Sequence, residues 1–551
     1  MPSHGSWSTG VPGMTSPPED TSFNIGLCWF AMQRLPPLLG AFEKEIDGVR
    51  AAEDIEYIHR MRVASRRLRA ALPLFRTCFP QKQYARWMQE IADITRALGE
   101  ARDADVQIAF LTRYRKKNAA AGRARNRTGE AGTNMLEPAV AYLLQDLQKR
   151  RKQLQVRVLS ALGALEKSGI LDEMHALFAA RAGVTRRAPV QALAYGIPTV
   201  AALRISSRLA TLCSFEPWVT HADAVAEHHA MRIAAKKLRY TMEVYGPVYR
   251  LGLRKPHARV KKVQEILGDL HDCDVWIDQV TRLLLRERSR LRSQNEEKRP
   301  DTATLFSLRL FLKDRERERI MLHRRFLRYW HTLIRQGIWD DLRVDLITGR
   351  KKRFVPARDA GEQETRTACE TRSAAYPEGL SHHRAVTRLA LMLFDGLQPL
   401  HNLTRHDRLL LECSGMLHDT GWLEGARRHN ARSARRIFSD EILPLDIPGR
   451  IAVGLVSLAH RGKVQIESHP LFLLLGGEQQ RTVLRLASIL RVADGLDFLH
   501  EGTVQEVRCI TGSHEITCDI IATTDVTREK ERARSKSALF VRMFERELVI
   551  R

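Results

Sequence analysis

From about residue 23 to residue 340, apolar side chains recur along the chain with the spacing of an α-helix. The stretch EYIHRMRVASRRLRAALPLF, residues 56–75, places an apolar residue at nearly every third or fourth position. Segments that alternate between apolar and polar residues, as strands do, are hard to find in this region. The pattern therefore predicts an almost entirely helical N-terminal domain.

A second helical region follows a polar interruption. Residues 341–375 lose the periodicity and predict a linker, and helical spacing returns from about residue 379 to 500. The segments TVQEVRCI and HEITCDII are rich in β-branched residues and flank the turn-like TGS, so they predict a hairpin. A final helix is expected from about residue 528 to 546.

These patterns predict a mainly α protein with a small C-terminal β-hairpin. We expect a disordered tail at 1–22, a helical domain at 23–340, a linker at 341–375 and a second module at 376–551. The tail has neither the basic nor the apolar segment of a secretion signal.

The first helical region contains an internal repeat. IHRMRVASRRLRAAL begins at Ile58 and HHAMRIAAKKLRYTM begins at His228, so His59 and His229 are 170 residues apart. Further on, ALGEARDADV matches ILGDLHDCDV with an offset of 169 between Gly99 and Gly268. A duplicated bundle is indicated, with repeats at about 23–180 and 190–340.

Each repeat carries a cationic stripe along one helical face, opposite an apolar face. The stripes comprise His59, Arg62, Arg66 and Arg69, and then His229, Arg232, Lys236 and Arg239. Neighbouring cations repel one another unless an anion lies along them, and arginine suits phosphate because its guanidinium donates two parallel hydrogen bonds. Two such stripes and a net charge of +25 favour a polyanionic ligand over a merely solvated surface.

Acidic residues and aromatic content refine this interpretation. Asp103, Asp105, Asp272 and Asp274 form two DxD pairs, which we expect to orient the basic side chains or cap a helix rather than to hold a metal. Aromatic residues make up only 7% of the chain, which disfavours nucleic-acid binding by base stacking.

HRMRVASRRLR with LGEARDADV, repeated as HAMRIAAKKLRY with LGDLHDCDV, resembles the CHAD domain, the conserved histidine α-helical domain, over roughly residues 24–336. The resemblance implies two helical bundles about a pseudo-twofold axis, with a basic channel that binds inorganic polyphosphate. By motif match, the channel residues would be His59, Arg62, Arg66, Arg69, His229, Arg232, Lys236 and Arg239, with Lys237, Lys261 and Lys262 added.

The C-terminal region places histidine and aspartate inside otherwise apolar helices. Four separate segments carry His383, the His418–Asp419 pair, His460 and Asp494. Buried polar groups must find partners, and a shared divalent cation would satisfy several at once. We expect His383, His418, Asp419 and Asp494 to bind Mn, Fe, Co, Ni or Zn, or Mg with fewer nitrogen ligands.

HRAVTRLA, LHDTG and RVADGLD resemble the HD superfamily of phosphohydrolases, and the stretch from about residue 377 is similar to the C-terminal region of the exopolyphosphatase/guanosine pentaphosphate phosphatase family. The resemblance implies metal-dependent phosphate hydrolysis, for which we expect Asp419 and His460 to be catalytic. His429, Arg461 and Lys463 are expected to contact substrate phosphate.

Two departures from that family keep two functions open. Arg432 stands where a second histidine is common, which argues against a two-metal site completed by that segment. The family's actin-like catalytic domain is replaced by the CHAD-like region. The chain is therefore either a hydrolase of polyphosphate or of a phosphorylated nucleotide, or a non-catalytic polyphosphate-binding regulator.

Eight cysteines are scattered singly, with no CxxC motif, so neither a disulfide framework nor a zinc ribbon is predicted. No apolar run reaches membrane-spanning length. A cytoplasmic protein without a membrane partner is expected, associated with polyphosphate granules.

Overall fold

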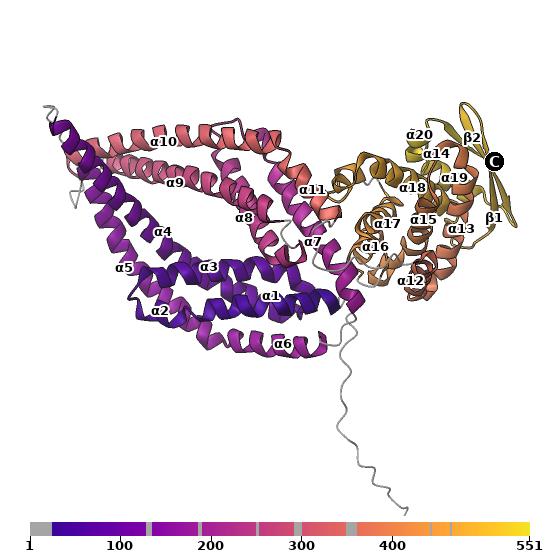
Figure 1. The fold of residues 1–551 in the computed structure, drawn as a ribbon, viewed down its shortest axis with the longest axis horizontal. Helices are drawn as coiled ribbons and strands as arrows, with labels where there is room; N and C mark the ends of the chain where they lie inside the picture. Colours follow the sequence, from indigo (N-terminus) through magenta and orange to yellow (C-terminus); the bar gives the residue numbers. More distant parts are fainter. Residues whose placement is uncertain are drawn as a thin grey trace, which may run out of the picture.

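The computed structural model describes residues 25–127, 135–185, 190–249, 253–290, 300–348, 361–440, 443–462 and 465–551. Nearly all of this chain is helical, and its strands form one small sheet near the C-terminus (Figure 1). The expected mainly α fold is thus confirmed. The expected tail at 1–22 lies outside the described residues.

The N-terminal domain consists of long helices in two similar series. The first series is α1 (Ile25–Glu43), α2 (Ile46–Ala51), α3 (Ile55–Ala71), the 3-10 helix η1 (Leu72–Cys78), α4 (Gln81–Arg127), α5 (Glu137–Ser168) and α6 (Ile170–Thr185). The second is α7 (Val190–Cys213), η2 (Glu216–Trp218), α8 (Val225–Tyr245), η3 (Gly246–Tyr249), α9 (Arg254–Arg290), α10 (Thr302–Arg335) and α11 (Ile338–Thr348). Helices α3, α4 and α5 of the first series correspond to α8, α9 and α10 of the second, as the repeat predicts.

The two series touch at both ends of their long helices. Figure 1 shows the α4–α5 and α9–α10 hairpins diverging from α3 and α8 and converging again at their far ends. There α5 contacts α10, and residues such as Leu111, Val140, Trp276 and Phe311 form a second hydrophobic core. At the near end α3 contacts α8, which brings the two cationic helices together.

The local sequence explains the orientation of α3. The side chain of Asp54 accepts a hydrogen bond from the backbone N–H of Glu56 and so begins the helix. Ile58, Met61 and Leu68 are buried in the main core, which leaves the cationic stripe on the other face.

The C-terminal module is a helical bundle followed by a small sheet. Its helices are α12 (Glu362–Ala374), η4 (Pro377–Gly379), α13 (Leu380–Gly396), α14 (Gln398–His401), α15 (Arg405–Leu417), η5 (Thr420–Glu424), α16 (His429–Ser439), α17 (Ile447–Ala459), η6 (Ile466–Ser468), η7 (Phe472–Leu474) and α18 (Gly477–Gly495). The chain then forms β1 (Val504–Thr511), β2 (Glu515–Ala522), α19 (Thr527–Ser535), α20 (Ala538–Phe544) and β3 (Glu547–Ile550).

The end of this module differs in part from expectation. The hairpin is confirmed, since β1 and β2 pair antiparallel with Cys509 opposite Cys518, but β3 adds a parallel strand to β2. The single helix expected at 528–546 is wrong, because the chain leaves the helix at Lys536. This break lets the Lys536 ammonium contact the carboxylate of Asp494.

Residues 341–375 are not simply a linker. Helix α11 extends to Thr348, and α12 packs against α15 with Cys369 fully buried and Arg372 paired with Asp440. The sequence pattern missed α12 because the residues that it buries include the small polar Thr365 and Ser373. Helix α12 therefore belongs to the C-terminal module.

Two further features concern the whole chain. Cys28 of α1 and Cys78 of η1 form a disulfide across 50 residues, a pairing that the cysteine spacing did not predict. Helices α16 and α17 contact α7, so the C-terminal module packs on the second series of the N-terminal domain. Among the described helices, none is both long and apolar enough to cross a membrane.

Candidate functional site

The first candidate site is the set of cations that α3 and α8 bring together, which we call the basic patch. It consists of His59, Arg62, Arg66, Arg69, His229, Arg232, Lys236 and Arg239. Burial, followed by the charges of Arg66, Arg232, Arg62 and Arg239, lowers the pKa of Lys236 to about 7. The two predicted stripes therefore form one cationic region that spans both repeats.

Protein carboxylates compensate this charge only in part. Arg62 Nη2 lies 2.9 Å from Asp103 Oδ1, and Arg239 Nη1 lies 3.1 Å from Glu243 Oε1. The Nε donors of Arg66, Arg69 and Arg232 are buried without a hydrogen-bond partner among the described residues. Buried donors without an acceptor are costly, so an incoming anion would stabilise this arrangement.

Glycines and aspartates repeat around the patch in both series. A Cβ at Gly99 would lie 3.6 Å from Arg62 Nε, and one at Gly268 would lie 3.7 Å from Arg232 Nε. Asp105 pairs with Arg151 of α5, and Asp274 pairs with Arg319 of α10. Asp103 pairs with Arg62 of the basic patch, as expected, whereas Asp105 and Asp274 hold arginines outside it. These aspartates lie within α4 and α9 rather than at a helix cap.

The three lysines that the family resemblance added lie at the margin of the basic patch. Lys237 is exposed on α8, and the ammonium groups of Lys261 and Lys262 lie 3.9 and 3.3 Å from the carboxylate of Glu265 on α9. An unpredicted histidine lies closer, because His271 Nδ1 is 3.2 Å from His229 Nδ1.

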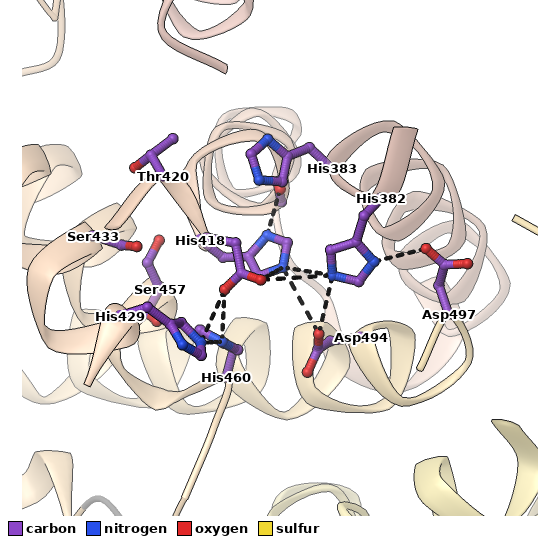
Figure 2. A network of polar contacts seen from close by, with 12 residues as sticks. His382, His383, His418, Thr420, His429, Ser433, Ser457, His460, Asp494 and Asp497 are labelled. Carbon is purple, nitrogen blue, oxygen red and sulfur yellow. Dashed lines mark hydrogen bonds and ion pairs between the residues drawn. The ribbon is translucent and has the colours of Figure 1, made fainter. Parts of the chain in front are cut away.

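The second candidate site is a buried cluster of histidines and aspartates in the C-terminal module. Its members are His382 on α13, His418 and Asp419 after α15, His429 at the start of α16, His460 after α17 and Asp494 on α18. Figure 2 shows four imidazoles from these separate segments turned toward a common centre. None of the six residues is more than 8% exposed.

Asp419 lies between two pairs of imidazoles. Its Oδ2 is 3.8 Å from Nε2 of both His382 and His418, and its Oδ1 is 3.2 Å from Nε2 of both His429 and His460. The Nε2 atoms are 3.3 Å apart within each pair. One carboxylate therefore faces two separate groups of nitrogen atoms.

The opposite nitrogen of each ring is already bonded to the protein. Nδ1 of His382 lies 2.7 Å from an oxygen of Asp497. In the other three rings Nδ1 faces a backbone carbonyl: that of Gly415 at 2.7 Å for His418, of Ala426 at 3.0 Å for His429 and of Ser457 at 2.6 Å for His460. Carbonyl oxygens can only accept, so three of these Nδ1 atoms carry the proton. The matching Nε2 lone pairs then point at the cluster centre, as in histidines that bind metal.

Protonation of the cluster fits a cation site. Burial lowers the pKa of His418 to about 3, which keeps this ring neutral. Burial would raise the pKa of Asp419, but the imidazoles of His418, His429 and His460 outweigh it and hold the pKa far below the usual range. Neutral imidazole and ionised carboxylate are the forms that bind metal.

Two observations indicate that a bound cation would replace a proton of the cluster. Asp419 Oδ1 is buried and accepts no hydrogen bond from the described residues. Burial lowers the pKa of His382, but hydrogen bonds with Asp494 and Asp497 outweigh it and raise the pKa to about 9. A proton on His382 thus balances the carboxylates, and a divalent cation would displace it.

The predicted ligand set needs one correction and two additions. His383 lies outside the cluster, since its Nδ1 is 2.7 Å from Ser373 Oγ, and the adjacent His382 occupies the expected place. His429 and His460, expected near substrate and in catalysis, lie within the cluster. Arg432, at the position where a second histidine is common, donates hydrogen bonds to the backbone carbonyls of Glu424 and Gly425.

Other residues around the cluster were missed or lie at its edge. Asp497 holds His382, and the exposed His500 stacks on that ring with centroids 3.7 Å apart. Lys536 gives Asp494 a second partner. Arg461 is exposed after α17, and the predicted Lys463 lies outside the described residues.

Comparison with known proteins concerns mainly the first site. Residues 33–281 match the family model described as the CHAD domain. Two uncharacterized proteins of Mycobacterium tuberculosis, from strains CDC 1551 / Oshkosh and ATCC 25618 / H37Rv, are 28% identical over 225 residues. The match covers 40% of this chain and 39% of each relative, so the chain spans about two fifths of their length.

Two solved structures are similar to this chain at lower sequence identity. The crystal structure of the CHAD domain from the plant Ricinus communis has a TM-score of 0.40 and 21% identity, covering 55% of this chain and 92% of that one. PptA from Streptomyces chartreusis has a TM-score of 0.35 and 14% identity, covering 56% of this chain and 99% of that one.

The substitution Lys236→Met should stabilise the ligand-free protein, most strongly in acid. The folded-state pKa of about 7 lies below the ordinary 10.5, so the charged lysine costs stability in full below pH 7, and the cost is relieved as pH rises from 7 towards 10.5. Denaturation at about pH 6 should show a gain of about 1 kcal/mol or more. The gain should shrink at about pH 9.

The exposed neighbour Lys237 supplies the control, since Lys237→Met should leave the free energy of unfolding unchanged. Equal stability of wild type and Lys236→Met in acid would show that the basic patch is not strained by its own charge.

Proposed function

We propose, because the N-terminal part of the chain carries a CHAD domain, that its basic patch binds inorganic polyphosphate. Polyphosphate supplies acceptor oxygens to the buried Nε donors of Arg66, Arg69 and Arg232, which have no partner among the described residues. Consecutive helical turns space the cations by about 5–6 Å, so one stripe can follow several phosphates of an extended chain. Association with cytoplasmic polyphosphate granules would follow from this binding.

For the C-terminal module we propose a metal-dependent phosphohydrolase of the HD type. The observation that carries this proposal is the position of Asp419, whose two oxygens face two different imidazole pairs. The cluster offers donors for two cation sites. One site would use His382, His418, Asp494 and one oxygen of Asp419, and the other would use His429, His460 and the second oxygen of Asp419. These nitrogen and carboxylate donors suit Mn, Fe, Co, Ni or Zn. Bound divalent cations would supply an activated water and neutralise charge on the reacting phosphate.

The residues of the chain itself position this chemistry. Asp497 and the carbonyls of Gly415, Ala426 and Ser457 hold the four rings by Nδ1, so Nε2 of each ring stays aimed at the centre. Asp419 holds the two halves of the cluster together. Arg461, exposed beside His460, offers a guanidinium to substrate phosphate. The proposed substrate is polyphosphate or a phosphorylated nucleotide.

A non-catalytic role is the second candidate function. The ligand residues are all buried, and α16, which begins at His429, contacts α7 of the N-terminal domain. Helix α7 in turn packs against α8, which carries half of the basic patch. A metal-stabilised module in this position would report polyphosphate binding or dock a partner without hydrolysing phosphate.

Polyphosphate should bind the full chain with an affinity that falls steeply as salt rises, because binding releases counterions. The combined change Arg62→Ala, Arg66→Ala, Arg232→Ala and Lys236→Ala should weaken binding by about 100-fold or more and flatten the salt dependence. Titration calorimetry at several salt concentrations measures both effects, and circular dichroism checks that the helices remain.

A matched control changes four exposed cations of α10, namely Arg309, Lys313, Arg317 and Arg324, to alanine. The control removes the same charge and should bind polyphosphate almost as the wild type does. Equal losses in the two variants would mean that net charge, and not the basic patch, holds the polymer.

Metal content should distinguish the two adjacent histidines of α13. His382→Ala and Asp419→Asn should each lower bound metal and phosphate release by about tenfold or more, because each removes a ligand from the cluster. His383→Ala should keep the metal, since His383 bonds Ser373 instead. Elemental analysis and phosphate release from polyphosphate and guanosine tetra- and pentaphosphate measure these outcomes.

The same assays separate the two functions. Metal-dependent phosphate release that disappears in Asp419→Asn supports the hydrolase. Full metal occupancy without hydrolysis of any of these substrates favours the regulatory module, and metal loss in His383→Ala alone would contradict the cluster itself.

A further inference from the structure

A cavity of about 770 Å³ lies between α12, α13 and α15, outside both candidate sites. The residues that line it on α13 include Leu380, Thr387 and Leu391, whereas His382 on the same helix contacts Asp494 and Asp497 of the α18 segment. The cavity and the metal cluster are therefore on different sides of α13. Its volume is in the range of small-molecule binding pockets.

The apolar lining of the cavity is aliphatic and thioether. Leu380, Leu391, Met392, Met416 and Ala374 supply it, and no Phe, Tyr or Trp of the described residues lines the cavity. Methionine side chains adapt to the shape of a flexible apolar ligand. A ligand that requires stacking on an aromatic ring, such as a nucleobase, would find no such ring here apart from the imidazole of His383.

Most polar groups that line the cavity are already satisfied within the protein. Ser373 bonds His383, Thr371 and Thr387 donate to backbone carbonyls one helical turn earlier, Arg388 donates to the carbonyls of Val504 and Gln505, and Arg408 pairs with Asp395. A ligand in this cavity therefore receives few hydrogen bonds along its length, which favours an apolar body.

One cation of the lining remains available. Arg384 is exposed and forms no ion pair with the described residues, whereas Arg408 pairs with Asp395 and Arg388 donates to two backbone carbonyls. Glu370 also lines the cavity without an ion pair among the described residues, but it is exposed on α12. Arg384 thus offers charge complementarity for a single anionic group at the rim.

We propose that this cavity binds an elongated aliphatic anion, with its chain against Leu391, Met392 and Met416 and its carboxylate at Arg384. The lining residues on α13 run from Leu380 to Asp395, which at the rise of an α-helix extends over about 22 Å and suits a long chain. The site is independent of the metal cluster and of the basic patch.

The test titrates the full-length protein with hexadecanoate below its micelle concentration and follows binding by calorimetry. Wild type should bind one hexadecanoate per chain. Arg384→Glu should weaken binding by about tenfold or more, because it replaces a charge-assisted hydrogen bond by repulsion. Leu391→Asp, which places a charge against the aliphatic chain, should abolish binding.

One control variant defines the result. Arg481→Glu makes the same charge change at an exposed position of α18 and should leave binding unchanged. No binding by wild type, wild-type affinity in both Arg384→Glu and Leu391→Asp, or tighter binding of dodecyltrimethylammonium than of hexadecanoate would overturn the proposal.

Discussion

The C-terminal module is organised around the buried carboxylate of Asp419, which lies between two pairs of imidazoles. Asp419 is 5% exposed, its Oδ1 accepts no hydrogen bond from the described chain, and its neighbours present nitrogen lone pairs. An ionised buried carboxylate without a cation is strongly unfavourable, and several kcal/mol separate a compensated from an uncompensated buried charge. The helices α13, α15, α16, α17 and α18 each bring a polar residue to this point. Metal binding and the stability of the bundle are therefore coupled, because a cation at Asp419 would also hold five segments together.

The N-terminal domain also concentrates buried charge, but its charge is positive. Its basic patch concentrates cations across the α3–α8 contact, where burial and then the charges of neighbouring arginines lower the pKa of Lys236 to about 7. The surrounding apolar core and the second core where the hairpins converge hold the stripes together despite their repulsion. In that second core the Arg315 guanidinium lies 5.0 Å from the ring centres of Phe110 and Tyr114 and pairs with Asp314, so this cation is satisfied where those of the patch are not. The two modules thus share one feature, which is charge that the protein compensates only in part. The basic patch would be stabilised by an anion, and the cluster around Asp419 by a cation.

Sequence periodicity was sufficient for the helices, the duplication and the basic patch, because each depends on which residues share a helical face. It was insufficient between His382 and His383, which are adjacent and about 100° apart on α13. The burial pattern does not separate them, since Val386, Leu389 and Leu393 follow His382 at helical spacing and Val386, Ala390 and Phe394 follow His383 in the same way. The pairing of His429 with His460 and the contact of Lys536 with Asp494 depend on tertiary packing, which no local pattern records. The Cys28–Cys78 disulfide and the aliphatic cavity arise in the same way, from segments that meet only in the folded chain.

The positions of bound metal ions would show whether Asp419 is shared between two cation sites. A crystal of the full chain grown with Mn²⁺ or Zn²⁺ and measured at the absorption edge of that metal would locate each cation by its anomalous scattering. We expect two peaks about 3.5–4 Å apart, with Asp419 between them. One peak should lie between His382, His418 and Asp494, and the other beside His429 and His460. No peak at Asp419, or a single peak held by His383, would contradict this expectation.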